Sequence, residues 1–399
     1  MTDERRYVHP LLALLVAAGA LGCPGQAIRF GAVLPLSGHA EVYGQAIRKG
    51  IEVAYQQAQK DPAFAQLQLE FVDSASDPER AKTELRKIYK GGAIAAIGGV
   101  TSAEALAMVK VADDEGRVLL SPSASLPQLT GISENFFRIF PSDFSEGTVM
   151  ARYAYDNLRL RAGVILAKEE TYAMGIQKIF GDEFQRKGGR ILETIEYPAN
   201  TAEFAALADR AVTLKPDFAY VAAYAAEISQ MIQDLRAQGF AGLILTTSSF
   251  AAAETIQRTG AAAESAYFTQ ATFETEGKKI TPEVQVFVEA FRTRFGTAPD
   301  LYAAHGYDAF NVLVEAYRQG GTTALSFWKG MRNIRELRGV TGVLQFDEKG
   351  DVTKFPHVYI VTQGKPVDVE ERRQEEILRA RQEIERIQRE MERLRNSGS

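Results

Sequence analysis

The chain of 399 residues contains a single cysteine, Cys23, and only four histidines, His9, His39, His305 and His357. One thiol permits no disulfide within the chain and no all-cysteine metal site. The histidines are scattered singly, so they do not form the compact set of ligands that a zinc site needs. The sequence therefore predicts no metal and no cofactor, and it argues against redox chemistry.

An excess of positive charge is also lacking. The 46 Lys and Arg residues face 51 Asp and Glu, which gives a net charge of -5, and no basic block stands alone. Nucleic acid is therefore not an expected partner. A hydrophobic share of 46% and a charged share of 24% are typical of globular proteins and exclude a disordered, collagen-like or multi-span membrane protein. At roughly 150 residues per domain, two or three folded units are expected.

Catalytic motifs are missing as well. The chain has no Gly-x-Ser-x-Gly elbow, no His-Glu-x-x-His, no Gly-Lys-Ser/Thr phosphate loop and no Gly-x-Gly-x-x-Gly after a strand. His305 and Asp308 share the start of a predicted helix, but without a third ligand a structural role explains them better. No two carboxylates are paired by the sequence into an acid/base couple. The sequence predicts a protein that is not an enzyme.

The N-terminus has the features of a targeting signal. Two arginines precede an uncharged apolar stretch, residues 11–21, which is too short to span a bilayer but fits the core of a signal peptide. Residues 20–23 (Ala-Leu-Gly-Cys) resemble a bacterial lipobox, although Ala20 replaces the usual leucine. We therefore expect a signal peptide at residues 1–22, lipidation of Cys23 and an extracytoplasmic protein tethered to a membrane. Plain secretory cleavage with an incidental thiol is the alternative.

From residue 28 onward, short apolar runs alternate with helical patterns, as in parallel βαβ units whose strands are buried on both faces. The predicted strands are 28–34, 67–72, 93–97, 118–120, 163–167, 191–197, 218–224, 243–247, 267–271, 342–346 and 357–361. The predicted helices are 42–59, 78–90, 102–115, 171–187, 201–215, 227–238, 282–295, 303–319 and 323–334. Residues 140–147 read as a break between two units. The predicted fold is α/β, with two doubly wound sheets.

Ligands of such sheets bind outside the carboxyl ends of the strands, so two sheets predict one cleft between two lobes. Ser102 opens a predicted helix directly after a strand, where free N–H groups and a partial positive charge suit a carboxylate. The other polar side chains that lie at or near predicted strand ends are Ser123, Ser125, Tyr172, Tyr224, Ser248 and Ser249. Each serine could instead be an ordinary cap or turn residue, and each tyrosine a packing residue.

Four ordered segments carry a family resemblance. They are Leu-Pro-Leu-Ser-Gly at 34–38 with Tyr43-Gly44 and Gly50, Ser-Pro-Ser-Ala-Ser at 121–125, Tyr-Ala-Ala-His-Gly-Tyr-Asp-Ala at 302–309, and Gly-Val-Leu-Gln-Phe-Asp at 342–347 with Gly350-Asp351. Between residues 28 and 364 the chain resembles the periplasmic branched-chain amino-acid binding proteins, the type I solute receptors of ABC transporters.

The resemblance implies two Rossmann-like lobes that are joined by three crossovers and close on a ligand by hinge motion. The implied crossovers lie near residues 141–145, 270–273 and 346–350. Lobe 1 is expected to comprise residues 27–143 and 271–346, and lobe 2 residues 144–270 and 347–366. An ABC permease is the implied partner, and a regulatory or scaffold lipoprotein that reuses this fold is the alternative function.

By position, the resemblance implies that Ser102, Ser123 and Ser125 hold a ligand carboxylate, while Tyr43, Tyr172 and Tyr224 form the walls. Ser248 or Ser249 stands where amino-acid binders commonly place an acid for the ligand ammonium. A buried ammonium without a countercharge is costly, so either Glu227 substitutes or the ligand has no amino group. Amino acids, amides, and aliphatic or aromatic acids all stay open as ligands.

Residues 367–399 form a charged tail with a seven-residue repeat. The apolar positions are Ile377, Ile384 and Met391 at a, and Ala380, Ile387 and Leu394 at d. The flanking positions are Glu376, Glu383 and Glu390 at g, and Arg381, Gln388 and Arg395 at e. This pattern fits a parallel coiled-coil homodimer with Glu–Arg pairs between chains. A single solvated helix, held by pairs such as Glu375–Arg379 and Glu385–Arg389, fits equally well.

Overall fold

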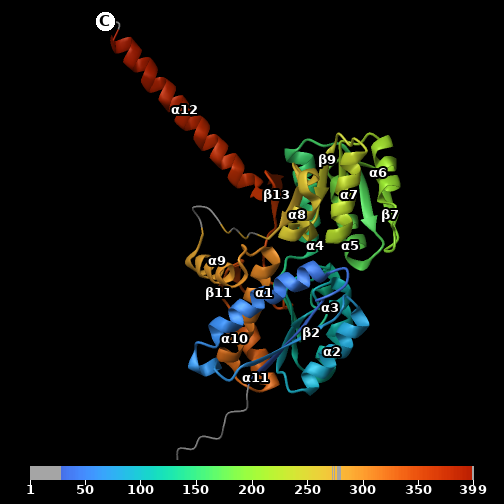
Figure 1. Cartoon of the computed structure of the whole chain (residues 1–399), viewed down its shortest axis with the longest axis vertical. Helices are drawn as coiled ribbons and strands as arrows, with labels where there is room; N and C mark the ends of the chain where they lie inside the picture. The colour runs from blue at the N-terminus through green and yellow to red at the C-terminus, as the bar shows by residue number, and fades with distance from the viewer. Residues whose placement is uncertain (1–27, 272, 274, 276–279, 398–399) are drawn as a thin grey trace, which may run out of the picture.

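The computed structural model describes residues 28–271, 273, 275 and 280–397, the last segment without the side chains of 392 and 394–397. The predicted signal peptide, residues 1–22, and Cys23 lie outside the described residues. The chain folds into two lobes, and a long helix projects from one of them (Figure 1). None of the described helices combines the length and the apolar character that crossing a membrane requires.

Lobe 1 is built on a five-stranded parallel sheet in the order β2-β1-β3-β4-β5. Its strands are β1 (Arg29–Leu34), β2 (Gln68–Asp73), β3 (Ala95–Gly98), β4 (Val118–Ser121) and β5 (Phe136–Arg138). Its first helices are α1 (Glu41–Ala58), α2 (Pro78–Lys90) and α3 (Ser102–Glu115). Strands β3, β4 and β5 are buried along their whole length. This is the pattern expected of strands covered on both faces.

Lobe 2 contains a seven-stranded sheet in the order β14-β13-β10-β9-β8-β6-β7. The parallel strands are β6 (Ala162–Lys168), β7 (Arg190–Tyr197), β8 (Phe218–Ala222), β9 (Leu243–Thr246) and β10 (Tyr267–Gln270). The antiparallel edge consists of β13 (His357–Thr362) and β14 (Lys365–Asp368). The lobe's helices are α5 (Thr171–Arg186), α6 (Phe204–Thr213), α7 (Ala225–Ala237) and α8 (Ala253–Thr259). Together the two sheets confirm the predicted α/β fold class.

After lobe 2 the chain returns to lobe 1 with α9 (Pro282–Phe295), α10 (Leu301–Gly320) and α11 (Ala324–Asn333). Helix α10 lies against α1 in Figure 1, although the two are far apart in sequence. A Cβ on Gly50 would lie 1.8 Å from the carbonyl oxygen of Ala303, and a Cβ on Gly306 would lie 2.2 Å from that of Ile47. Glycine is therefore required at both positions, because the two backbones touch.

The chain passes between the two sheets three times: between β5 and β6, after β10, and before β13. The first and third passages are joined by a buried ion pair. The Arg138 guanidinium, which is fully buried, donates two hydrogen bonds of 2.7 Å to the Asp351 carboxylate. It also donates to the hydroxyl of Thr130 and to the carbonyl of Leu126. The lobe boundaries at residues 143, 270 and 346 stay a prediction.

Several predicted elements are wrong in detail. Residues 140–147 are not a simple break, because α4 (Asp143–Arg152) begins there and Ser142 caps it by accepting from the N–H of Phe144. Residues 342–346 do not join a main sheet, since β12 (Gly342–Leu344) pairs only with β11 (Leu337–Gly339). The tail does not start at residue 367: β14 extends to Asp368, and the helix α12 (Val369–Ser397) follows.

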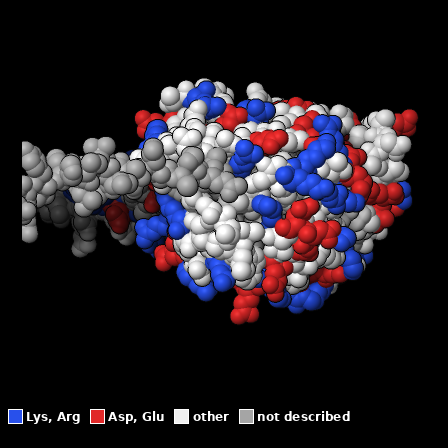
Figure 2. Space-filling model, turned by 90° about the horizontal axis from the view of Figure 1, so that it is seen from below, with Lys and Arg blue, Asp and Glu red and all other residues white. Residues whose placement is uncertain are grey.

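Charged side chains of both signs are interspersed on the face shown in Figure 2. Across the described residues, many charged side chains form local pairs along one helix, such as Lys110–Asp114 and Lys178–Asp182. Exposed pairs of this kind contribute little, at most about 1 kcal/mol each. The buried Arg138–Asp351 pair is different, because removing one partner leaves a charge without a countercharge.

We expect Asp351→Asn to destabilise the protein by about 3–5 kcal/mol, since the substitution leaves the Arg138 guanidinium buried and unneutralised. Denaturant unfolding measures the effect, with Asp182→Asn as the control. Asp182 belongs to an exposed pair, so its substitution should cost less than about 1 kcal/mol. Equal effects of the two substitutions would contradict a structural role for the buried pair.

Candidate functional site

One pocket lies between the lobes at the carboxyl ends of both sets of parallel strands. The side chains that line it are Tyr43, Val100, Ser102, Ser123, Ser125, Phe140, Tyr172, Tyr224, Ser248, Ser249 and Tyr302. The space between them is about 20 Å³, which is room for roughly one water molecule. Any larger ligand must therefore enter while the lobes are further apart.

The structure brings seven of the eight sequence-predicted ligand-binding residues to this wall. They are Tyr43, Ser102, Ser123, Ser125, Tyr172, Tyr224 and Ser248. Glu227, the eighth, is not among the lining residues. Its carboxylate accepts a 2.5 Å hydrogen bond from the Lys168 ammonium, with both side chains largely buried. Glu227 is thus already paired with a cation of its own lobe.

Helix α3 begins at the pocket, where a capping box forms its amino-terminal end. The Thr101 hydroxyl accepts from the N–H of Glu104, and the Glu104 carboxylate accepts from the N–H of Thr101. This leaves the N–H groups of residues 102 and 103 without an acceptor inside the helix, and they carry the positive end of its dipole. The end of α3 is therefore suited to a ligand carboxylate.

Three serines near this end of α3, Ser102, Ser123 and Ser125, differ in whether their hydroxyl can still donate a hydrogen bond to a ligand. The Ser123 hydroxyl donates to the carbonyl of Val100, so its proton is already used. The Ser102 hydroxyl accepts from the N–H of Leu126, which leaves its own proton for another acceptor. The main chain of Ser125 is held by a 2.8 Å bond from the N–H of Asp143. Ser102 is thus a donor toward the pocket, while Ser123 fixes the turn that precedes α3.

Aromatic rings form the rest of the wall. Tyr172 and Tyr224 of lobe 2 stack with centroids 5.3 Å apart. Tyr43 and Tyr302 of lobe 1 lie 4.6 Å apart, and Tyr43 also contacts Tyr224 at 5.9 Å. Phe140 stacks on Tyr302 at 6.1 Å. Rings from both lobes therefore enclose the pocket and supply an apolar surface with hydroxyl groups at its edge.

Two tyrosine hydroxyls connect the lobes directly. The Tyr43 hydroxyl donates to the carbonyl of Ser249 at 3.0 Å and accepts from the N–H of Ala225 at 2.7 Å. The Tyr302 hydroxyl donates to the carbonyl of Ser248 at 3.0 Å. Tyr43 lies on α1 and Tyr302 on α10, whose glycine contacts fix both side chains relative to each other. These three hydrogen bonds join the two lobes directly beside the pocket.

Ser248 faces an acid that sequence reasoning missed. Both its N–H and its hydroxyl donate to the Glu146 carboxylate, at 2.6 and 2.8 Å, and Thr269 donates to the same carboxylate. Burial raises the pKa of Glu146, while the bonds from Ser248 and Thr269 oppose that shift. The Ser248 carbonyl already accepts from Tyr302. Ser248 therefore forms part of the wall with its polar groups satisfied by the protein.

Asp143, one turn before Glu146 on α4, is the second missed acid. Its side chain is fully buried, and neither carboxyl oxygen has a hydrogen-bond partner among the described residues. Burial, together with the neighbouring Glu146, raises its pKa well above the ordinary value, while the nearby Ser125 side chain opposes that shift. The hydroxyls of Tyr172 and Thr247 are likewise buried without a partner in the described part of the chain. The wall of the pocket and the buried layer behind it thus contain polar groups whose bonding is incomplete.

The sequence held only a weak signal for these missed residues. Asp143 and Glu146 fall in the segment that was expected to be a break, and Tyr302 was noted only as part of a resembling segment. Their helical spacing and the cap residue Ser142 are the features that could have placed both acids on one helical face.

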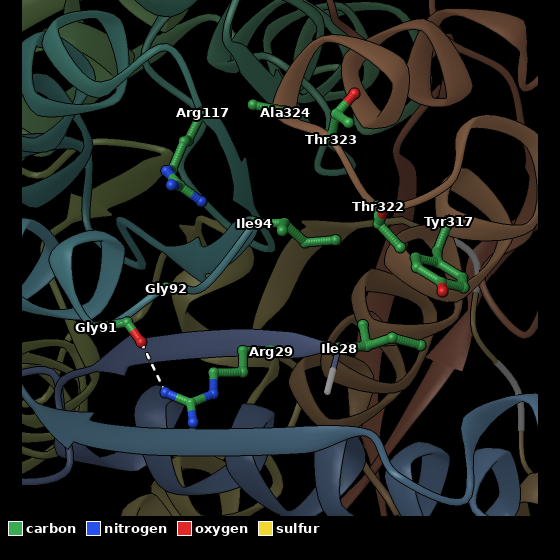
Figure 3. Close-up of a pocket in the computed structure, with 10 residues that line it drawn as sticks. All are labelled: Ile28, Arg29, Gly91, Gly92, Ile94, Arg117, Tyr317, Thr322, Thr323 and Ala324. Atoms are coloured by element: carbon green, nitrogen blue, oxygen red, sulfur yellow. Dashed lines mark hydrogen bonds between the residues drawn. The ribbon is translucent and has the colours of Figure 1, made fainter. Parts of the chain in front are cut away.

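A second, larger hollow of about 450 Å³ lies at the opposite, amino-terminal edge of the lobe 1 sheet (Figure 3). Its two arginines are already engaged. Arg29 donates to the carbonyl of Gly91, and Arg117 donates to that of Ala93. Because doubly wound sheets bind ligands at the carboxyl ends of their strands, the small inter-lobe pocket is the better candidate.

Comparison with known proteins identifies the family. A family model described as periplasmic binding protein matches residues 27–365. The chain belongs to the periplasmic binding proteins. The family comprises extracytoplasmic solute-binding components of ABC transporters, which are not enzymes.

Individual relatives agree with this assignment. The chain is 23% identical to a Leu/Ile/Val-binding protein homolog of Brucella melitensis, over 86% of this chain and 94% of the relative. A leucine-binding protein of Thermotoga maritima has 27% identity and a TM-score of 0.80, with 86% and 97% coverage. A benzoate-bound solute-binding protein of Rhodopseudomonas palustris has the same fold, with 21% identity, a TM-score of 0.79, and 86% and 96% coverage.

We expect Tyr43→Phe to weaken closure of the binding protein, because the substitution removes two of the three hydroxyl bonds between the lobes. At about 0.5–1.5 kcal/mol per bond, the closed form should lose roughly fivefold to a hundredfold in population relative to the open form. Small-angle scattering of the protein should show a larger radius of gyration.

Tyr55→Phe is the matched control. The Tyr55 hydroxyl also makes two hydrogen bonds, to the carbonyl of Leu67 and from the side chain of Gln59, but both lie within lobe 1. Its removal should lower stability and leave the lobe separation unchanged. An equal change in the radius of gyration for both variants would contradict the role of the Tyr43 hydroxyl in holding the lobes together.

The buried acid Asp143 should make stability depend on pH. Because its pKa is raised in the folded state, the native protein binds a proton that the unfolded chain releases, and stability falls as pH rises above about 4. Asp143→Asn removes this dependence, so its melting temperature relative to the parent should become more positive between pH 5 and pH 8. A difference that stays constant over this range, as expected for the exposed Asp182→Asn, would contradict the assignment.

Proposed function

We propose that this binding protein captures a small carboxylate-bearing solute outside the cytoplasm and delivers it to an ABC permease. The observation that carries the proposal is the pocket between the lobes, where the amino-terminal end of α3 faces a ring of aromatic side chains. No reaction is required of it. The useful event is the closing of two lobes around the solute.

The carboxylate of the solute would bind at the end of α3. The N–H groups of residues 102 and 103 and the hydroxyls of Ser102 and Ser125 would donate to it. Charge-assisted bonds to a carboxylate are stronger than neutral ones, and the helix dipole adds to them. The stacked rings of Tyr172 and Tyr224 would cover the apolar part of the solute.

A second polar group on the solute fits the other end of the pocket. The Tyr172 hydroxyl belongs to the wall and is buried without a partner among the described residues. Glu227 does not line the pocket: one of its oxygens bonds to Lys168, and the other is buried without a partner among the described residues. The polar groups of Ser248 bond to Glu146 and Tyr302, so the wall presents no free carboxylate to an ammonium. The relatives named for leucine and the neighbour solved with benzoate both support a carboxylate as the common feature. We therefore expect a hydroxyl group on the solute, rather than an ammonium, to strengthen binding.

Lipidation of Cys23 would place the protein at a membrane surface. Only five residues separate Cys23 from Arg29, the first residue of β1, a span of at most roughly 20 Å. The anchor would therefore lie near the amino-terminal edge of the lobe 1 sheet, at the hollow of Figure 3. The cleft opens at the opposite, carboxyl-terminal edge of that sheet and would stay accessible to solutes.

Thermal unfolding against a ligand panel tests the proposal, after partial unfolding and refolding to remove any retained solute. The panel pairs phenylalanine with 3-phenylpropanoate and 4-hydroxybenzoate with benzoate, and adds leucine and aliphatic amides. A ligand at a thousand times its Kd stabilises the native state by about 4 kcal/mol, which should raise the melting temperature by several degrees. No shift from any carboxylate with folded protein would contradict the proposal.

For the ligand that binds, Ser125→Ala should weaken the affinity by about tenfold or more, a loss of about 1.4 kcal/mol. Ser145→Ala is the control, because Ser145 lies on α4 near the cleft but does not line the pocket. An unchanged Kd for Ser125→Ala, measured by calorimetry, would remove this residue from the site while leaving solute binding itself intact.

A further inference from the structure

Helix α12 leaves the two lobes and projects into solvent (Figure 1). At 1.5 Å per residue its 29 residues extend about 43 Å. Every described side chain from residue 372 onward is exposed, while the first turn is held against lobe 2. Asp368 accepts from the N–H groups of Glu370 and Glu371, and its other oxygen contacts His357. The helix is therefore anchored to lobe 2 at its first turn, and its remaining length, from residue 372 onward, is exposed to solvent.

One face of this exposed part of α12 is apolar, and no other described part of the chain covers it. Ile377, Ile384 and Met391 recur every seven residues and are 45%, 55% and 63% exposed. Ile387, three positions after Ile384, is 47% exposed. A seven-residue repeat of this kind forms a straight seam only when a partner helix winds around it. An isolated helix gains nothing from placing these side chains in one line.

The charges that flank the seam specify the partner and its direction. In the heptad repeat, Glu376, Glu383 and Glu390 occupy g positions, and Arg381, Gln388 and Arg395 occupy e positions. In a parallel pair of identical helices, each glutamate faces the residue five positions later on the partner, so that two of three contacts on each side are Glu–Arg. In an antiparallel pair, glutamate would face glutamate and arginine would face arginine. The sequence therefore favours a parallel pair of copies of itself.

Existing contacts within α12 do not oppose this pairing. Glu376 is bonded to Arg372 and Glu383 to Arg386, but these exposed pairs contribute only about 0.5 kcal/mol each. Arg381 and Glu390 make no ion pair in the described part of the chain. Both are thus available to a second helix.

We propose that α12 joins two copies of this binding protein as a parallel two-stranded coiled coil. Isoleucine at two of the three a positions is compatible with two strands, and the mixed d positions Ala380, Ile387 and Leu394 do not repeat the isoleucine at both a and d that favours more strands. About two and a half heptads give weak association in solution. Two copies tethered to one membrane would associate more strongly, since tethering raises their effective concentration. The lobes would lie at the same end of the coiled coil, joined to it through lobe 2.

Sedimentation equilibrium over a concentration series tests the proposal, with the chain from residue 24, which keeps every described residue. The parent protein should show reversible monomer–dimer association. Ile384→Lys should weaken it by about tenfold or more. Leu378→Lys is the matched control: Leu378 is equally exposed at 52% but lies off the seam, so its substitution should change nothing. Unchanged melting of the lobes in each variant shows that folding is intact.

A charge exchange tests whether the flanking charges pair between the two chains. Glu376→Arg/Glu390→Arg and Arg381→Glu/Arg395→Glu should each associate at least about tenfold more weakly than the parent. An equimolar mixture should recover parent-like association as a heterodimer. A monomer at every concentration, a trimer or tetramer, equal effects of Ile384→Lys and Leu378→Lys, or no recovery in the mixture would each overturn the proposal.

Discussion

Two lobes that separate and close again on the same contacts need connecting segments whose own positions do not drift. The Arg138–Asp351 ion pair meets this requirement, because it ties the first passage between the lobes to the third. A fully buried guanidinium tolerates little displacement: each of its donors must keep an acceptor, and here the carboxylate, a hydroxyl and a carbonyl supply them. Both sides of the cleft are positioned from this point.

The binding site depends on this ion pair only indirectly, through the helices that carry its side chains. Tyr43 and Tyr302 come from helices that are adjacent in space only because glycines let their backbones touch. Their hydroxyls bond to main-chain groups of lobe 2. The contact between the lobes therefore depends on the backbone positions of lobe 2 rather than on particular side chains there. The acids on α4 lie behind the same wall. One of them satisfies Ser248, whereas the other, Asp143, stays without a partner among the described residues. The well-bonded Arg138, at the end of β5, and the incompletely bonded Asp143, at the start of α4, therefore lie in the same passage between the lobes.

The fold followed from sequence because its signals are local. Continuous apolar runs and helical periodicity recover most of the strands and helices, and strand ends predict where polar side chains gather. The short strands β5, β11 and β14 and the helices α4 and α8 were missed. The site was harder. Ser102, Tyr172 and Tyr224 were predictable from strand ends, but Glu146 was not, since its role depends on Ser248 and Thr269, more than a hundred residues away. The sequence likewise could not show that Lys168 occupies Glu227, or that β5 would form with only three residues. Long-range pairing of buried charges leaves no periodic trace.

The attachment of α12 decides how dimerisation and ligand capture can coexist. Strand β14 pairs with β13, which pairs with β10, so the helix is continuous with the lobe 2 sheet. A coiled coil would thus hold two copies of lobe 2 and leave each lobe 1 free to open and close. The predicted lipid anchor, in contrast, precedes β1 in lobe 1. Closure would then move the tethered lobe relative to the paired lobe, which makes the relative position of membrane and coiled coil depend on whether solute is bound.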